Sequence, residues 1–272
     1  MSQVWLIGRP VAHSLSPAMH NAAFAKLGLP HRYEAKETSD DQLAATLDRM
    51  RRDDVLGANV TIPHKEAVLR LVDEVTDEAR RIGAVNTVIR REGRLIGDNT
   101  DRLGFHRGLE SAGILEVTNQ DVLVLGAGGA ARACVLELRG GNDVLVANRS
   151  VERAERLVAS MPPESGGDLR AIGWDEARQL NWVDALVNAT PLGMQGEDAL
   201  DGFTFDPLPA IIADLVPIAG ETPLVHRARE AQHVRVMDGL LMLLHQAARS
   251  FELWTGVPAP LEVMRAALPR PV

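Results

Sequence analysis

The segment DVLVLGAGGAARACV, residues 121–135, decides the fold. It begins with an apolar run of strand length and ends with small residues that suit the first turns of a helix. Between them, Gly126 permits a tight turn, Gly128 lets the backbone approach a pyrophosphate, and Ala131 allows close packing of helix on strand. The free N–H groups at the start of such a helix face the phosphates. The segment therefore predicts a dinucleotide-binding turn; the alternative is a tight strand–helix turn without a ligand.

Further apolar runs of strand length follow this turn. The six runs are residues 122–125, 144–146, 169–172, 185–187, 211–213 and 234–236, and stretches of helix length separate them. Continuous apolar strands joined by helices are typical of a parallel sheet covered on both faces, because buried strands cannot alternate in polarity. Residues 121 to 237 are therefore predicted to form a doubly wound α/β unit.

The first hundred residues predict a second α/β unit. Strands are expected at residues 4–7, 33–36, 58–62, 85–90 and 94–96, and a helix at 17–27. Pro17 suits the first turn of that helix and Gly28 its C-terminal cap. Residues 239–254 are apolar over most of a helix circumference, so we expect a buried helix that returns to the first unit. The expected domains are 1–102 plus 238–272, and 103–237.

The composition excludes several classes of protein. The 272 residues include 29 basic and 37 acidic side chains, a formal net charge of −8, and a single cysteine, Cys134. An acidic chain without a Lys/Arg tract has no electrostatic footprint for nucleic acid or an anionic membrane. One cysteine excludes an internal disulfide and a cysteine-rich zinc site, and it is typical of a reducing compartment. With neither a signal peptide nor an apolar run long enough to span a membrane, we expect a cytoplasmic protein that binds small molecules.

Arginines follow the second strand of the dinucleotide-binding unit. The chain reads Asn148-Arg149-Ser150 about 20 residues after the turn, where an NAD site would carry an acidic residue for the ribose 2′-hydroxyl. The Arg149 guanidinium can instead pair with a 2′-phosphate, and Ser150 and Arg153 can extend that pocket. This pattern favours NADP over NAD. The alternative is that Arg149 and Arg153 form a solvated helix face.

Polar residues follow several predicted strands of the first unit, at residues 13–17, 59–65, 83–87 and 97–101. In open α/β sheets the ligand crevice lies beyond the carboxyl ends of the strands, so these groups are expected to converge on one small oxygenated molecule. Taken singly, each has a second explanation: Ser14 and Ser16, or Asn99 and Thr100, can cap helices, and Asn86-Thr87 can form a turn.

Lys65 stands out because the 29 basic residues include only three lysines, Lys26, Lys36 and Lys65. Lysine can release its proton whereas arginine cannot, so a lysine retained at a polar strand end indicates proton transfer; codon preference also explains the ratio. Asp101 is its natural partner, because a nearby carboxylate orients the ammonium.

Three histidines compete with Lys65 as acid–base groups. They are His13, His64 and His245, and they lack the spacing of metal ligands. A surface or hydrogen-bonding role is favoured for all three, and no metal site is expected.

Taken together, these segments resemble the shikimate dehydrogenase family over almost the whole chain. The residues that carry the resemblance are Gly8 to Asn21, Asn59 to Lys65, Gly83 to Thr87, Asn99 to Asp101, Gly126 to Ala130, Asn148-Arg149, Asn188 to Met194, Thr222 to Leu224 and Gly239 to Gln246. The resemblance implies an N-terminal substrate domain, a Rossmann-type NADP domain and last helices that return to the first domain. It also implies the reversible reduction of 3-dehydroshikimate to shikimate, a step toward chorismate and the aromatic amino acids. We expect the protein to be a monomer or a homodimer.

The resemblance also implies roles for individual residues. Lys65 and Asp101 would be the catalytic pair, Ser14 and Ser16 would hold the substrate carboxylate, and Thr61, Asn86, Asp101 and Gln246 the ring hydroxyls and the keto oxygen. On the cofactor side it implies Gly126, Ala127, Gly128, Gly129 and Ala130 at the pyrophosphate, Asn148, Arg149, Ser150 and Arg153 at the 2′-phosphate, Asn188, Thr190, Gly193 and Met194 beside the nicotinamide, and Gly239 and Met242 near the reactive ring. The ammonium of Lys65 would stabilise and protonate the oxyanion that hydride addition creates.

One residue departs from the family pattern. Three residues after Asp214, where the family usually carries a tyrosine near the substrate carboxylate, this chain has Pro217. Proline cannot donate a hydrogen bond, and a lost bond to a charged group costs roughly 1.5–3 kcal/mol. This departure leaves two alternatives open: a related enzyme acting on quinate or an amino analogue of shikimate, and a non-catalytic NADP-binding regulator.

Overall fold

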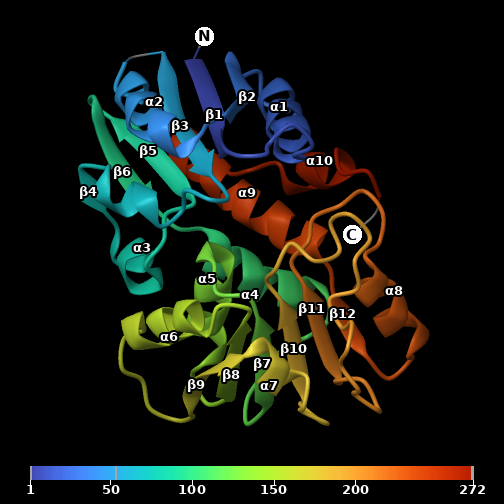
Figure 1. Cartoon of the computed structure of the whole chain (residues 1–272). Helices are drawn as coiled ribbons and strands as arrows, with labels where there is room; N and C mark the ends of the chain where they lie inside the picture. The colour runs from blue at the N-terminus through green and yellow to red at the C-terminus, as the bar shows by residue number, and fades with distance from the viewer. Residues whose placement is uncertain (1, 53, 271–272) are drawn as a thin grey trace. The chain divides into compact units, whose positions relative to one another are not determined.

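A computed structural model describes residues 2–52 and 54–270. The chain folds into two compact units (Figure 1). Unit 1 comprises Met1–Gly104 and Leu243–Val272, and unit 2 comprises Phe105–Met242. The sequence places the boundaries after residues 102 and 237, and the structure divides the chain a few residues later in both cases.

Unit 1 contains a mixed six-stranded sheet in the order β2-β1-β3-β5-β6-β4. Its strands are β1 (Ser2–Gly8), β2 (His31–Glu37), β3 (Val55–Val60), β4 (Glu74–Val75), β5 (Thr87–Arg91) and β6 (Arg94–Asp98). Strands β1, β2 and β3 are parallel, whereas β5 runs antiparallel to both β3 and β6. The sequence missed β4, because two residues carry no periodicity.

The remaining elements of unit 1 connect or cover these strands. They are α1 (Ser16–Lys26), η1 (Asp40–Gln42), α2 (Leu43–Met50), η2 (Ala67–Arg70), α3 (Asp77–Ile82) and α10 (Leu261–Ala266), together with the beginning of α4 (Asp101–Ser111) and most of α9 (Gly239–Thr255). The α1 helix has proline in its first turn, and Gly28 just beyond its end has a φ of 64°. Both features are as predicted.

The α9 helix is the buried C-terminal helix that the sequence predicts. Its residues Leu244, Phe251 and Trp254 are buried, and the indole Nε1 of Trp254 donates to the carbonyl of Val88 on β5 at 3.0 Å. A Cβ atom on Gly57 of β3 would lie 2.5 Å from Nε1 of the same ring. Glycine at that position therefore lets the helix pack directly on the sheet.

Unit 2 contains a parallel six-stranded sheet in the order β12-β11-β10-β7-β8-β9. Its strands are β7 (Asp121–Leu125), β8 (Asp143–Asn148), β9 (Leu169–Gly173), β10 (Ala185–Asn188), β11 (Ile211–Asp214) and β12 (Arg235–Met237), and its complete helices are α5 (Gly129–Leu138), α6 (Val151–Ser160), α7 (Trp174–Ala177) and α8 (Pro223–Glu230). All six predicted strands are present. The strand order reverses between β7 and β10, which is where doubly wound sheets bind dinucleotides, so the predicted α/β class is confirmed.

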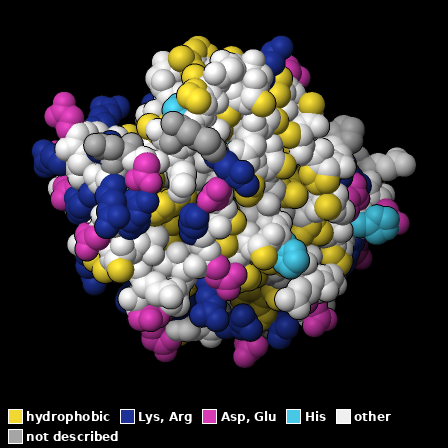
Figure 2. All heavy atoms as spheres, turned by 90° about the horizontal axis from the view of Figure 1, so that it is seen from above, with side chains coloured by type: hydrophobic (Ala, Val, Ile, Leu, Met, Phe, Trp, Pro, Cys, Tyr) yellow, Lys and Arg dark blue, Asp and Glu magenta, His cyan; other side chains and the backbone are white. Residues whose placement is uncertain are grey.

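Acidic and basic side chains are intermixed on the molecular face in Figure 2. In unit 1, Arg49 pairs with Asp54 at 2.7 Å, and Arg51 pairs with Asp73. Within residues 2–52 and 54–270, no helix is long and apolar enough to cross a membrane. The same residues contain no group of three or more His, Cys, Asp or Glu side chains placed to hold a metal ion.

Candidate functional site

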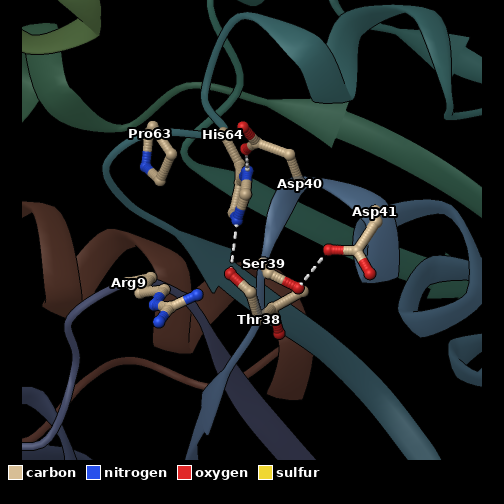
Figure 3. Close-up of a pocket in the computed structure, with 7 residues that line it drawn as sticks. All are labelled: Arg9, Thr38, Ser39, Asp40, Asp41, Pro63 and His64. Atoms are coloured by element: carbon tan, nitrogen blue, oxygen red, sulfur yellow. Dashed lines mark hydrogen bonds and ion pairs between the residues drawn. The ribbon is translucent and has the colours of Figure 1, made fainter.

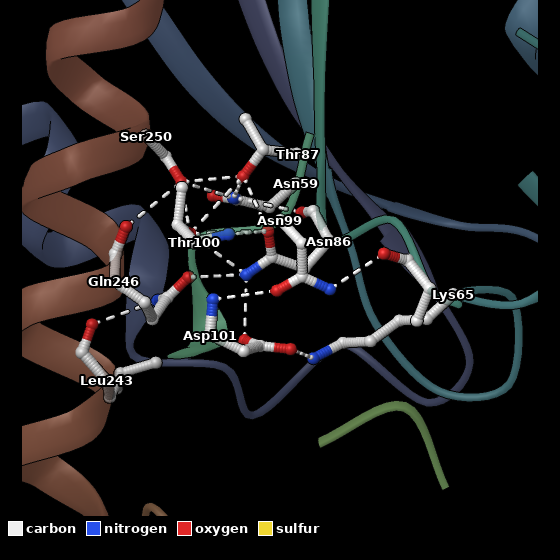
Figure 4. Close-up of polar contacts among 11 residues, drawn as sticks. Asn59, Lys65, Asn86, Thr87, Asn99, Thr100, Asp101, Leu243, Gln246 and Ser250 are labelled. Carbon is white, nitrogen blue, oxygen red and sulfur yellow. Dashed lines mark hydrogen bonds and ion pairs between the residues drawn. The ribbon is translucent and has the colours of Figure 1, made fainter. Parts of the chain in front are cut away.

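Lys65 and Asp101 form a largely buried ion pair in unit 1 (Figure 4). The Nζ atom of Lys65 lies 2.6 Å from Oδ2 of Asp101, and the two side chains are 15% and 4% exposed. Asp101 is the first residue of α4, and its N–H donates to Oδ1 of Asn99 at 2.9 Å. An ammonium has three N–H donors, so one bond to Asp101 leaves Lys65 able to donate to a substrate oxygen. The pair thus joins a proton donor to a group that orients it.

Asn86 connects this pair to the rest of the site. Its Nδ2 donates to Oδ1 of Asp101 at 2.7 Å, and its Oδ1 accepts the N–H of Thr100 at 2.8 Å. Oε1 of Gln246, on α9, lies 3.4 Å from the same Nδ2. The structure therefore brings four of the predicted residues together, and Asn86 is a buried bridge rather than part of a turn.

Hydroxyl and amide groups form a second layer behind Asn86 (Figure 4). The Oγ of Ser250 on α9 lies 2.8 Å from Oγ1 of Thr87 and 3.1 Å from Oγ1 of Thr100, and it accepts from Nδ2 of Asn59 at 3.0 Å. All four residues are buried. In a low-dielectric interior such bonds reinforce one another, so this layer fixes the orientation of Asn86 and, through it, of Asp101.

Ser14, Ser16 and Thr61 are the other substrate-binding residues predicted in unit 1. Among the described residues 2–52 and 54–270, none of the three makes a hydrogen bond to Lys65 or Asp101. Ser14 Oγ accepts the N–H of Ser16 at 3.3 Å, but the N-cap of α1 is Leu15 and no side chain caps this helix, so the capping alternative is wrong for both serines. The N–H of Thr61 donates to Ile7 at 2.8 Å, at the beginning of the turn that leads to Lys65.

Tyr33 and His20 belong to the surroundings of the site, in roles that the sequence does not predict. The Tyr33 hydroxyl donates to Oδ1 of Asn59 at 2.9 Å and also hydrogen-bonds the side chain of Ser16. Burial raises the pKa of Tyr33 far above its usual range, so the phenol stays a neutral donor. The His20 ring stacks on Tyr33 with 4.4 Å between ring centres, and burial lowers its pKa to about 3. No local pattern reveals such a cluster.

In the glycine-rich turn of unit 2, some small residues are required by the fold and another leaves space for a ligand. Gly126 has a φ of 103°, and a Cβ there would lie 2.9 Å from the carbonyl oxygen of Ala189, so the fold requires glycine. Ala131 is completely buried in α5. By contrast, a Cβ on Gly128 would meet no heavy atom within 4 Å. Gly128 therefore leaves open space before the N-terminus of α5, in the place where a pyrophosphate fits.

Arg149 and Arg153 are exposed at the end of β8 and the start of α6. Within the described residues, neither guanidinium lies within ion-pair distance of a carboxylate, so both are available to a phosphate. Asn148 Nδ2 donates to the Ser150 carbonyl at 2.8 Å and shapes the turn. The Ser150 hydroxyl donates to Glu152 at 2.7 Å, so it must rotate before it can meet a 2′-phosphate.

Asn188, at the end of β10, uses its whole amide inside the following loop. Its Nδ2 donates to the carbonyl of Leu192 and to Oδ1 of Asp214, both at 2.9 Å, while its Oδ1 accepts from the N–H and hydroxyl of Thr190 at 3.1 and 2.6 Å. The side chain is completely buried. Asn188 therefore shapes the loop that carries Thr190. The sequence analysis predicted contact with the nicotinamide, whereas the structure shows a role in holding the loop.

Asp214 is a buried residue that the sequence analysis used only to locate Pro217. Besides Asn188, its carboxylate accepts from the N–H of Val216 at 3.2 Å and from the hydroxyl of Thr222. Burial raises the pKa of Asp214 to about 6, and these hydrogen bonds oppose the rise. Its position beside Asn188 at the carboxyl edge of the sheet is the signal that could have identified it.

The other residues assigned to the nicotinamide side differ in their surroundings. Met194 is exposed and Met242 is buried. Gly193 has a φ of 108°, and a Cβ on Gly239 would lie 2.5 Å from the carbonyl of Val216. The fold itself therefore requires glycine at both positions, whatever they contact in a complex. Pro217 lies half-buried after Val216.

A glycine-rich turn at the switch point of a parallel sheet, in one chain with a buried Lys–Asp pair, defines a dinucleotide-dependent oxidoreductase. Three family descriptions match the chain: the shikimate dehydrogenase substrate binding domain at residues 6–88, the shikimate/quinate 5-dehydrogenase family at 110–191, and the shikimate 5′-dehydrogenase C-terminal domain at 239–268.

Individual relatives cover nearly the whole chain. The shikimate dehydrogenase (NADP(+)) of Methanopyrus kandleri is 45% identical over 97% of this chain and 94% of its own length, and that of Symbiobacterium thermophilum is 43% identical over 96% and 92%. Among solved structures, the shikimate 5-dehydrogenase of Thermus thermophilus in complex with NADP(H) and shikimate is 40% identical to this chain. The match has a TM-score of 0.82 and covers 98% of each chain. The chain belongs to the shikimate dehydrogenase family.

Proposed function

We propose that this protein catalyses the reversible, NADP-dependent reduction of 3-dehydroshikimate to shikimate, with Lys65 and Asp101 as the catalytic pair. The observation that carries the proposal is the 2.6 Å contact of Lys65 Nζ with the buried carboxylate of Asp101, in a chain of this family. NADPH, when bound, supplies the hydride that is added to the keto carbon.

In the reduction, unit 1 stabilises the negative charge that develops on the keto oxygen and donates a proton to that oxygen. Hydride addition leaves negative charge on the former keto oxygen. The Lys65 ammonium stabilises that charge and donates its proton to the oxygen, and it then recovers a proton from solvent. Asp101, held by Asn86, keeps the ammonium in place throughout. In the reverse direction the same Nζ, in its neutral form, accepts the proton of the shikimate hydroxyl.

We assign substrate binding to unit 1 and NADP binding to unit 2. Ser14 and Ser16 are proposed to hold the substrate carboxylate, because Ser14 lies in the segment that follows β1 and Ser16 begins α1 directly after it. Thr61, Asn86 and Gln246 are proposed to contact the ring oxygens. The hydroxyl groups and amides of these residues provide both donors and acceptors, as a polyhydroxylated ring requires.

On the cofactor side, the open space at Gly128 and the N-terminus of α5 suit the pyrophosphate. Arg149 and Arg153 suit the 2′-phosphate, because two guanidinium groups with no carboxylate partner among residues 2–52 and 54–270 can provide charge-assisted hydrogen bonds. We further propose that the enzyme acts in the cytoplasm as a monomer or a homodimer; sedimentation velocity distinguishes the two oligomeric states.

The test is the formation of NADPH, followed by its absorbance, with shikimate or quinate as substrate and NADP⁺ or NAD⁺ as cofactor. We expect the highest kcat/KM with shikimate and NADP⁺. Higher kcat/KM with quinate would favour the quinate enzyme that Pro217 leaves open. No turnover with either acid, while NADPH still binds, would contradict the proposal and favour a regulatory role.

A further inference from the structure

His64 precedes Lys65 in the chain and is itself buried, with only 1% of its side chain exposed. Its Nε2 lies 2.7 Å from the carbonyl oxygen of Thr38, just beyond β2, and its Nδ1 lies 3.3 Å from Oδ1 of Asp40 (Figure 3). Because a carbonyl oxygen can only accept, Nε2 carries a proton and donates it to Thr38. The side chain thus ties the turn after β3 to the end of another strand.

The backbone of this turn is held at several other points. The N–H of Thr61 donates to Ile7 at 2.8 Å, the N–H of His64 donates to Thr61 at 3.0 Å, and the carbonyl of Lys65 accepts the N–H of Val85 at 2.8 Å. These bonds fix the ends of the turn. The bond from His64 to Thr38 is a side-chain anchor directly beside the residue whose ammonium must meet Asp101.

The charged groups around the imidazole come from two neighbouring segments. His64 lines a cavity of about 290 Å³ together with Arg9, Asp40 and Asp41. Arg9 pairs with Glu37 at 3.5 Å, and Asp41 accepts from the hydroxyl of Ser39. Asp40, which is largely exposed, is therefore the carboxylate that faces the ring, and the buried contact with Thr38 is the one that solvent does not weaken.

We propose that His64 is a positioning residue for Lys65. Its hydrogen bond to the carbonyl of Thr38 fixes the turn from which the lysine side chain starts, and thereby the place of the ammonium relative to Asp101 and the reacting oxygen. The proposal rests on the catalytic role proposed for Lys65. Since an error of about 1 Å in a catalytic group can lower the rate by roughly a hundredfold, the anchor affects kcat more than substrate binding.

Three substitutions separate the hydrogen bond from the packing. His64→Gln keeps a donor near the place of Nε2, whereas His64→Asn is too short to reach Thr38 and His64→Leu has no donor. We expect Leu and Asn to lower kcat for shikimate oxidation by roughly ten- to hundredfold with KM changed by less than about threefold, and Gln to restore kcat to within about fivefold of wild type. If His64→Leu does not fold, the Asn/Gln pair makes the same comparison.

A matched control separates positioning from stability. Met264 on α10 is completely buried in unit 1, and α10 packs on α1 rather than on the turn that carries Lys65. Met264→Ala should lower the Tm at least as much as the His64 variants and leave kcat unchanged. If Met264→Ala lowers kcat as much as His64→Leu does, the effect is one of stability and the proposal is overturned.

The second measurement does not depend on the substrate. The chain has only three lysines, so acetylation of Lys26, Lys36 and Lys65 can be followed separately by mass spectrometry. His64→Leu and His64→Asn should change the acetylation rate of Lys65 severalfold and leave those of Lys26 and Lys36 unaltered. The proposal requires changes in both kcat and Lys65 acetylation, and any other combination overturns it. If the wild type does not oxidise shikimate, the proposed function fails, and acetylation alone decides the role of His64.

Discussion

The two units build their sites from different parts of the chain. In unit 1 the site consists of side chains that hold one another: Asn86 holds Asp101, and Asp101 holds Lys65. In unit 2 the candidate site is mainly backbone, with Gly128 leaving space before a helix and Arg149 exposed after β8. Changes in unit 1 should therefore affect the chemistry, and changes in unit 2 should affect which cofactor binds.

The units also differ in the buried group that responds to pH. Unit 1 buries His20, whose pKa is lowered to about 3, and unit 2 buries Asp214, whose pKa is raised to about 6. Desolvation disfavours the charged form in both cases. Because one group is a base and the other an acid, the same physical cause makes them respond to acid in opposite directions.

The largest effect is expected from Lys65→Ala. Without the ammonium, the developing oxyanion loses both its stabilising charge and its proton donor, so kcat should fall by about 10³-fold. The dissociation constant of NADPH, measured by fluorescence titration, should change by less than about twofold, because the cofactor is proposed to bind in unit 2. A kcat equal to that of wild type would remove Lys65 from the mechanism, and a large loss of NADPH affinity would break the division of roles between the units.

Arg149→Ala should produce the converse result. Removing one guanidinium from a 2′-phosphate should raise the KM for NADP⁺ by roughly ten- to hundredfold and leave the KM for NAD⁺ and the kcat nearly unchanged. Arg156→Ala, an exposed arginine further along α6, is the control and should change neither constant. Equal losses for NADP⁺ and NAD⁺ would show that Arg149 does not recognise the 2′-phosphate.

Acid should reveal the opposite behaviour of His20 and Asp214 in urea unfolding at pH 7 and pH 5. The native pKa of His20 lies below the unfolded value of 6.5, so the unfolded state binds the proton first and stability is lost as the pH falls below 6.5; by pH 5 the loss is roughly 2 kcal/mol. The native pKa of Asp214 lies above 3.8, so the native state binds the proton first and gains roughly 1 kcal/mol over the same interval.

Two substitutions isolate these contributions. His20→Phe keeps an aromatic ring against Tyr33 and should make the free energy of unfolding fall less between pH 7 and pH 5 than in wild type. Asp214→Asn should make it fall more, because the gain from protonating Asp214 is removed. If both variants show the same pH dependence of the free energy of unfolding as wild type, His20 and Asp214 do not control it.

The smallest effect is expected at Pro217. If the missing donor weakens binding of the substrate carboxylate, Pro217→Tyr should lower the KM for shikimate by a few-fold, up to roughly tenfold, with little change in kcat. A tyrosine introduced by a single substitution recovers only part of the roughly 1.5–3 kcal/mol of such a bond. Pro217→Ala, which adds no donor, is the control. An unchanged or higher KM in the Tyr variant would show that the chain binds the carboxylate fully without this residue.

The same difference between the units explains which parts of each site the sequence predicts. The sequence predicts a site in unit 2 because the signals are local: Gly126, Gly128 and Arg149 all belong to the consecutive elements β7, α5 and β8 or to the turns that follow them. The sequence does not predict the layer behind the Lys65–Asp101 pair, because Asn59 and Ser250 are 191 residues apart and meet only when α9 packs on the sheet. Ser, Thr and Asn are also common at caps and turns, so no single one of them indicates a buried network.

Some residues were recognised without their physical role. The motif that contains Asn188 was identified, but the bonds to Asp214 and Leu192 that make it part of the loop structure depend on the register of β10 and β11. His64 was assigned a surface or hydrogen-bonding role, and its burial against Thr38 depends on where β2 ends. Register and strand ends are tertiary features that one sequence specifies only weakly.

The chain passes between its two units inside helices, not in loops. The first passage, after Gly104, lies within α4, and the second, after Met242, lies within α9. Gene recombination exchanges modules most easily at exposed loops, but a cut at either passage would sever a helix and leave its terminal N–H and C=O groups without partners. Unit 2 is therefore poorly suited to transfer by itself into another protein. We expect the two units to be inherited together during evolution.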